Sequence, residues 1–259
     1  MMDEYRDGGG ELGEARRRAE SGDAGGAMEI LERLAAAGDP RAMVNLGAML
    51  ASMPGGDPGR PRELFRAAAE LGDLSGMRNL AYAHAVGRGA PKDKELAVKW
   101  YWEAARRGHA KAQCNLAVML RHGKGAPRDP AEAARWYAMS AEQGYFRAQA
   151  SLAAMLLAGE GAERDPEAAA AWYSKAAAQG SPRGMHRLAL MLADGSAGAK
   201  DEARAESLLR AAAEKGYAKA MFDLGEILER RGLSGEALAL YRAGSEKREP
   251  RCMRRLGSE

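Results

Sequence analysis

The strongest constraint on this fold is a short phrase that returns along the chain at an almost constant interval. Each copy has a small residue, three variable residues, and then a leucine followed by glycine or alanine. The leucines are Leu46, Leu80, Leu116, Leu152, Leu188 and Leu224, at intervals of 34, 36, 36, 36 and 36 residues. A fixed period in this range is typical of solenoids, in which each repeat buries its apolar face against its neighbours. The interval therefore predicts a stacked array rather than one globular core.

A second phrase follows each copy of the first and contains an aromatic pair. Three copies hold Trp-Tyr, beginning at Trp100, Trp136 and Trp172, ahead of small residues and a glycine. Each repeat thus contains two apolar-periodic segments of about 12 to 14 residues, a length and period typical of α-helices. The apolar residues, 46% of the chain, include many Ala, Leu and Met, which favour helix over strand. We expect both rings of each Trp-Tyr pair to lie in the core between helices.

The helix boundaries carry capping residues. Asp57, Asp129 and Asp165 each precede a proline, and an aspartate N-cap with proline at the first helical position is a strong helix start. Glycines such as Gly108 follow the second helices, where a left-handed residue is favoured. The sequence therefore predicts an all-α fold, a right-handed superhelical solenoid of stacked antiparallel helix pairs.

The repeat phrases also divide the chain into segments. We expect residues 1–10 to be disordered, residues 11–38 to form two N-terminal capping helices, and residues 249–259 to form a C-terminal capping half-repeat. Six repeats would fill residues 39–248. Their expected bounds are 39–72, 73–108, 109–144, 145–180, 181–216 and 217–248.

Taken together, these markers resemble those of the Sel1-like repeat family, a relative of the tetratricopeptide repeats. The resemblance rests on the elements A-xxx-LG, G-x-G, D-xxx-A and WY-xx-AA-xx-G, and it covers roughly residues 39–248. It is strongest over residues 73–180. The first repeat lacks the G-x-G loop, and the fifth and sixth lack the Trp-Tyr pair. The resemblance implies an adaptor or scaffold with protein partners and no catalysis.

The sequence gives little support for a metal site, an enzyme, a nucleic-acid-binding protein or a membrane protein. Two unrelated cysteines, Cys114 and Cys252, form neither a disulfide framework nor a zinc pattern, and no two histidines share the i, i+4 spacing of a metal site. No catalytic or phosphate-binding motif occurs, so we expect no catalytic residue, metal or cofactor. The net charge of +3 disfavours nucleic acid as a partner. Without a signal peptide or an apolar run of membrane-spanning length, we expect a cytoplasmic protein with no membrane insertion.

The resemblance implies that the residue before each repeat leucine faces a concave groove. In this chain that row is Asn45, Asn79, Asn115, Ser151, Arg187 and Asp223, and four residues earlier lie Arg41, Ser75, Lys111, Arg147, Arg183 and Lys219. From these two rows we single out as candidate ligand-binding residues Asn45, Asn79, Asn115, Lys111, Arg147, Arg183, Arg187 and Lys219. An asparagine can both donate to and accept from a peptide backbone, and the cations would favour an acidic segment. The alternative is that the amides bond to neighbouring helices and the cations are merely solvated.

The resulting hypothesis is a non-enzymatic scaffold that binds a protein or peptide segment in the groove, with a preference for an acidic segment. A second hypothesis is an immunity or regulatory protein that binds a folded partner through an edge or the convex face. A hydrolase or a nucleic-acid binder is less well supported, because fold alone implies no chemistry. The sequence specifies no oligomeric state.

Overall fold

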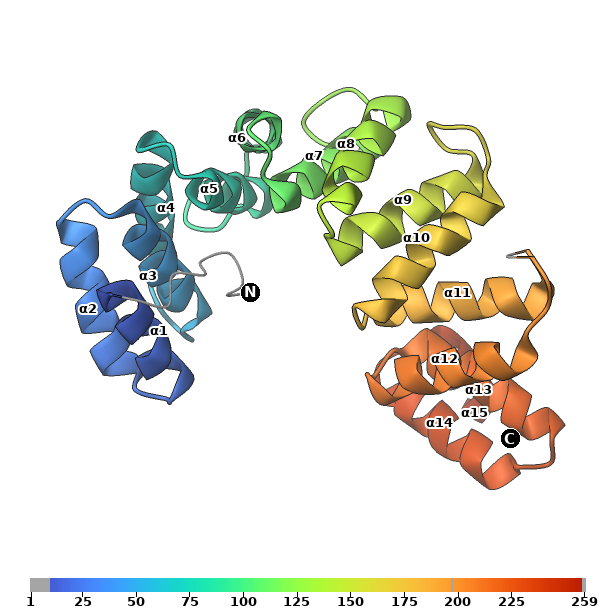
Figure 1. Cartoon of the computed structure of the whole chain (residues 1–259). Coiled ribbons are helices and arrows are strands. Elements are labelled where there is room, and N and C mark those ends of the chain that lie inside the picture. Colours follow the sequence, from blue (N-terminus) through green and yellow to red (C-terminus); the bar gives the residue numbers. More distant parts are fainter. Residues whose placement is uncertain (1–9, 197, 258–259) are drawn as a thin grey trace. The chain divides into compact units, whose positions relative to one another are not determined.

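Helices account for the regular structure of the computed structural model, which describes residues 10–196 and 198–257. Within those ranges the chain forms fifteen α-helices and no β-strand (Figure 1). The all-α prediction is therefore confirmed. Residues 1–10 are expected to be disordered; apart from Gly10, they lie outside the described residues.

The chain divides into two compact units, Met1–Asp129 and Pro130–Glu259. The helices of the first unit are α1 (Glu11–Glu20), α2 (Ala24–Ala36), α3 (Pro40–Ser52), α4 (Gly59–Glu70), α5 (Leu74–Val86), α6 (Lys94–Arg106) and α7 (Ala110–His122). Those of the second unit are α8 (Pro130–Glu142), α9 (Phe146–Ala158), α10 (Pro166–Ala178), α11 (Pro182–Asp194), α12 (Glu202–Glu214), α13 (Ala218–Arg230), α14 (Ser234–Glu246) and α15 (Pro250–Gly257).

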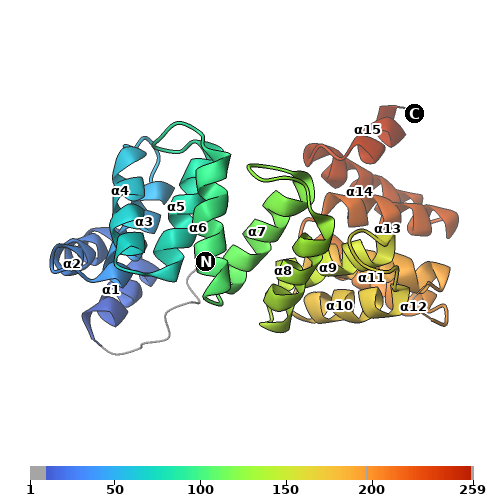
Figure 2. The ribbon, with the colours of Figure 1, turned by 90° about the horizontal axis from the view of Figure 1, so that it is seen from above.

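Within each unit, consecutive helices pack against one another as hairpins. In the first unit α3 packs on α4 and α5 on α6, and in the second unit α9 packs on α10, α11 on α12 and α13 on α14. Figure 2 shows the same helices from a second direction. Short connections force neighbouring helices to run antiparallel, and each pair then buries its apolar stripe against the next. This is the stacking of helix pairs that the repeat interval predicts.

Most helix starts follow the capping chemistry that the sequence indicates. The Asp93 carboxylate accepts from the Leu96 amide at 2.9 Å, which satisfies one of the donors left free at the start of α6. At Asp57 the expectation is off by one residue. There the aspartate accepts from the Gly59 amide at 2.8 Å, and Pro58 is the N-cap rather than the first helical residue.

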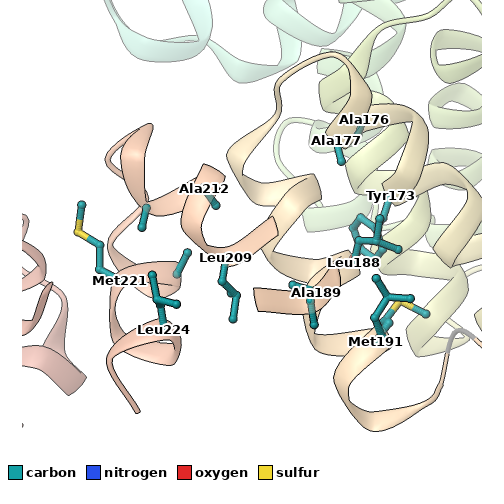
Figure 3. Close-up of a cluster of buried hydrophobic side chains, with 14 of the residues drawn as sticks. Tyr173, Ala176, Ala177, Leu188, Ala189, Met191, Leu209, Ala212, Met221 and Leu224 are labelled. Atoms are coloured by element: carbon teal, nitrogen blue, oxygen red, sulfur yellow. The ribbon is translucent and has the colours of Figure 1, made fainter. Parts of the chain in front are cut away.

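The apolar core of the second unit shows how successive repeats pack against one another (Figure 3). Tyr173, Leu188, Leu209 and Leu224, from α10 to α13, are all at least 95% buried. The burial of these residues removes a large apolar area from water, at about 25 cal/mol per Å². The core is thus continuous from one repeat to the next, as expected for a solenoid.

The Trp-Tyr pairs correct one expectation. The tyrosine of each pair, such as Tyr173, is buried, whereas Trp100, Trp136 and Trp172 are only partly buried. Successive residues of a helix point about 100° apart, so one helix face cannot carry both rings into the core. The tyrosine shares its face with small residues three and four positions later, and the tryptophan lies at the edge. There the Lys175 ammonium lies 4.1 Å from the Trp172 ring.

None of the described helices is both long and apolar enough to cross a membrane.

Candidate functional site

The eight candidate residues lie in two different units. Asn45, Asn79 and Asn115 lie on α3, α5 and α7 of the first unit, and all three are partly buried. Lys111, also on α7, is partly buried. The remaining candidates lie on the corresponding helices of the second unit and are exposed: Arg147, Arg183, Arg187 and Lys219. The amides therefore belong to the first unit and most of the cations to the second.

Asn79 is engaged by the residue that precedes it. Nη1 of Arg78 donates to Oδ1 of Asn79 at 2.6 Å. The same guanidinium lies 5.9 Å from the ring centre of Tyr82, one turn further along α5. Nε of Arg78 is buried and has no hydrogen-bond partner in the described part of the chain. The charge of Arg78 is thus held beside an amide and an aromatic ring rather than beside a carboxylate.

Asn115 has an unsatisfied donor. Its Nδ2 is buried and no described residue accepts from it with hydrogen-bond geometry. The side chain lies close to the hydroxyl of Tyr101 on α6. Burial raises the pKa of Tyr101, while the charge of Arg78 and the approach of Asn115 act in the opposite direction. A buried donor without a partner costs about 1–3 kcal/mol.

We call Arg78, Asn79, Tyr82, Tyr101 and Asn115 the amide cluster, because two asparagines bracket it. Its members come from α5, α6 and α7. Ser75 on α5 lies 3.3 Å from Nε2 of His109, the N-cap of α7, so the starts of these two helices are held together.

Asn45 is not part of the amide cluster, although α3 packs beside α5. Sequence reasoning placed two members in the row and missed Arg78 and Tyr82. The signal for Arg78 is an arginine at a position where four other repeats carry an apolar or small residue. The signal for Tyr82 is an aromatic residue at a position where the other repeats carry mostly small or aliphatic residues. The equivalents of Arg78 are Val44, Cys114, Ala150 and Phe222, and those of Tyr82 include Ala48, Val118 and Ala154.

At the other end of the row, Asp223 is occupied within the protein. Nε2 of His186 on α11 lies 2.5 Å from one carboxylate oxygen, and Nη1 of Arg251 on α15 lies 2.7 Å from the other. Burial alone would raise the pKa of Asp223, but the His186 hydrogen bond and the Arg251 charge outweigh it and lower that pKa. This triad connects three first helices of successive repeats. It is a structural link rather than an open binding position.

The cations of the second unit remain available. No described carboxylate pairs with Arg183, Arg187 or Lys219. Arg147 has an aromatic neighbour, since its guanidinium carbon lies 5.9 Å from the ring centre of Phe146. Side chains of this kind can neutralise an acidic ligand, although each exposed pair contributes only about 0–1 kcal/mol. Among the described residues, no group of three or more His, Cys, Asp or Glu side chains is arranged to hold a metal ion.

Comparison with protein families agrees with the repeat pattern. The model described as Sel1 repeat matches residues 40–73, 74–109, 110–145, 146–181 and 182–217. The resemblance drawn from the sequence is thereby confirmed. The expected repeat bounds, the sixth repeat over residues 217–248 and the capping segments stay predictions; the last match ends at residue 217. No curated protein matches the chain.

Solved structures share this architecture. A protective antigen of uropathogenic Escherichia coli with an SLR fold is 29% identical, with a TM-score of 0.75; the match covers 96% of this chain and 56% of that protein. The chain thus spans little more than half of that relative. A Sel1 repeat protein of Oxalobacter formigenes is 26% identical, with a TM-score of 0.79, over 90% of this chain and 96% of its own. An immunity protein of Pseudomonas aeruginosa, 21% identical with a TM-score of 0.51 over 79% of this chain and 82% of its own, shares the fold alone.

Proposed function

This chain belongs to the Sel1 repeat family, and from that premise we propose that it is a non-catalytic scaffold that binds an extended peptide segment across the amide cluster. The Sel1 repeat solenoid is typically a protein-interaction scaffold. The observation that supports the proposal is the buried Nδ2 of Asn115, for which no described residue is an acceptor with hydrogen-bond geometry, on the row that the family resemblance places at a concave groove. A backbone carbonyl of a bound peptide would accept from this nitrogen and remove the cost of leaving it unpaired.

The repeat interval suits an extended ligand. Packed helices stand about 8–10 Å apart, and an extended chain spans about 3.3 Å per residue. Asparagines on successive first helices would therefore meet a peptide backbone at about every third residue. Asn45 and Asn79, 34 residues apart in the sequence, would extend the contact from Asn115 along the first unit.

Two further members of the amide cluster can hold a side chain of the ligand. Tyr82 is 48% exposed, which is unusual for so large an apolar ring. Arg78 lies beside it, and no described residue accepts a hydrogen bond from its Nε. An aromatic ring beside a guanidinium favours a ligand residue that is planar or acidic. Lys111, on α7 of the same unit, supports the same preference for acidic segments.

A peptide selection followed by calorimetry tests this proposal. The full chain is used to select binders from a displayed library of random peptides, and the best peptide is titrated into wild-type protein and variants. We expect Asn115→Ala to weaken binding by about 5- to 150-fold, the equivalent of about 1–3 kcal/mol. Lys111→Ala should cost less, and its effect should fade at high salt. Ser151→Ala, at the same repeat position in the second unit, is the matched control.

Circular dichroism must show that each variant keeps its helix content. If the selected peptides bind Asn79→Ala and Asn115→Ala as tightly as wild type, the amide cluster is not the binding surface. The alternative is then the binding of a folded partner through an edge or the convex face, as for an immunity protein. That alternative predicts that only an intact folded partner, and no peptide from it, binds the chain.

A further inference from the structure

Two ionisable residues of the first unit replace apolar residues of the repeat. His84 on α5 lies four residues after its repeat leucine. In the other repeats that position is a leucine, namely Leu50, Leu120, Leu156, Leu192 and Leu228. Arg62 on α4 lies two residues before Leu64, which stands where other repeats carry the tryptophan of the Trp-Tyr pair. Its equivalents are Val98, Ala134, Ala170, Glu206 and Leu238, four of which are apolar. The other repeats of the chain thus show that packing alone favours apolar side chains at these two positions.

The two departures meet in space. Arg62 and His84 line the same hollow, of about 700 Å³, together with the loop that leads into α6, the first turn of α6, and Gly125. The loop after α7 closes on this site, because a Cβ at position 125 would lie 2.2 Å from the Lys94 carbonyl oxygen. Gly125 also has a φ of 79°, in the left-handed region. A glycine is therefore required where the loop meets α6.

Both residues contain a buried nitrogen without a partner. His84 is only 6% exposed, and its Nδ1 has no hydrogen-bond partner among the described residues. Nε of Arg62 is buried and likewise unpaired within the described chain. A buried polar atom without a partner is rare in native proteins, because it loses its bond to water and gains none. A leucine in place of His84 and an apolar residue in place of Arg62, as in most of the other repeats, would avoid this loss.

The charges around the hollow favour an anion. Arg62, Lys92 and Lys94 face it, against Asp93 and Glu95. The Asp93 carboxylate is already engaged by the Leu96 amide at 2.9 Å. The first amides of α6 have no carbonyl of their own helix to donate to, and the positive end of the helix dipole adds to their pull.

The surroundings of His84 lower its pKa, which favours the neutral ring. Burial lowers its pKa, and the charges of Arg62 and Arg66 lower it further, while Asp93 acts in the opposite direction. A neutral imidazole offers one N–H donor and one acceptor. It can therefore donate a single hydrogen bond to an anion that Arg62 neutralises.

We propose that this hollow, the Arg62–His84 pocket, binds an oxyanion, the carboxylate or phosphate group of a ligand. The guanidinium of Arg62 pairs with it, and the ring N–H of His84 and the first-turn amides of α6 donate to it. The pocket is separate from the amide cluster. Asn79 and His84 are five residues apart on α5, which places them roughly 140° apart around the helix. Either site can therefore fail without the other.

Histidine-selective NMR on the full chain tests the proposal. The chain has four histidines, so the spectrum contains few ring signals to assign. Inorganic phosphate and acetate are titrated separately at neutral pH and constant ionic strength, with chloride as the balancing anion. We expect saturable shifts of the His84 ring and none for His122, which is exposed on α7 and serves as an internal reference. Saturation with phosphate only, or with acetate only, identifies the oxyanion.

The other repeats supply the test variants. Arg62→Val should weaken the oxyanion about 10- to 100-fold, the loss expected for a charge-assisted hydrogen bond. His84→Leu should raise the melting temperature without anion and abolish the anion-induced rise seen in wild type. Lys99→Ala removes one charge from the exposed side of α6 and should change neither result. The proposal is overturned if neither anion shifts the His84 ring, if Arg62→Val responds like wild type, or if His84→Leu keeps the anion-induced rise.

Discussion

Replacing Asp223 by asparagine should destabilise the second unit and remove a defined part of its pH dependence. The side chain of Asp223 is 12% exposed and lies between His186, 4% exposed, and Arg251, 35% exposed. Removing one partner of a buried pair costs about 3–5 kcal/mol. Because Arg251 can turn toward water, we expect about 2–4 kcal/mol for Asp223→Asn.

The pH dependence has a definite sign. The folded protein lowers the pKa of Asp223 below its unfolded value of about 3.9. Its contribution is therefore fully present above that unfolded value and is lost as the pH falls through the lower folded pKa. The stability difference between wild type and Asp223→Asn should shrink as the pH falls below about pH 4.

Urea denaturation at several pH values measures this difference. Glu226→Gln, an exposed carboxylate on the same helix, is the matched control and should change stability by less than about 0.5 kcal/mol. Hydrogen exchange adds a local readout, since α15 is linked to α13 through Arg251 and should exchange faster in Asp223→Asn. A variant as stable as wild type at pH 7, or a difference that grows as the pH falls below about 4, would refute the role of the triad.

Three further stability changes follow from the packing. Tyr173→Ala should cost about 3–5 kcal/mol, and Trp172→Ala clearly less because that ring is only partly buried; parallel urea titrations compare them. His109→Ala should cost about 0.5–2 kcal/mol, because Nδ1 of this N-cap accepts from the Ala112 amide at 3.0 Å, and His109→Asp should recover part of the loss in thermal melts. Gly125→Ala should lower the melting temperature, because its Cβ would meet the Lys94 carbonyl and its φ is positive; an unchanged melt would contradict this close approach.

The sequence by itself determined the helices and the family. A constant interval, capping aspartates and left-handed glycines act over a few neighbouring residues, so they can be recognised without a structure. Asp93 and Asp165 accept from amides three residues later, as their position before a helix predicts. The same local signals predict the division into repeats, and the family model matches the chain five times.

Only the tertiary structure decided which side chains are buried, paired or left without a partner. Both rings of a Trp-Tyr pair look equally apolar in the sequence, but the rotation of each helix against its neighbours buries the tyrosine alone. Arg62 and His84 are 22 residues apart and belong to different repeats, and the stacking of α4 against α5 brings them to one hollow. Asp223 occupies the same repeat position as Asn115, yet its carboxylate is held by His186 and Arg251. The physical reason is that capping and periodicity are local, whereas pairing depends on residues that become neighbours only when the repeats stack.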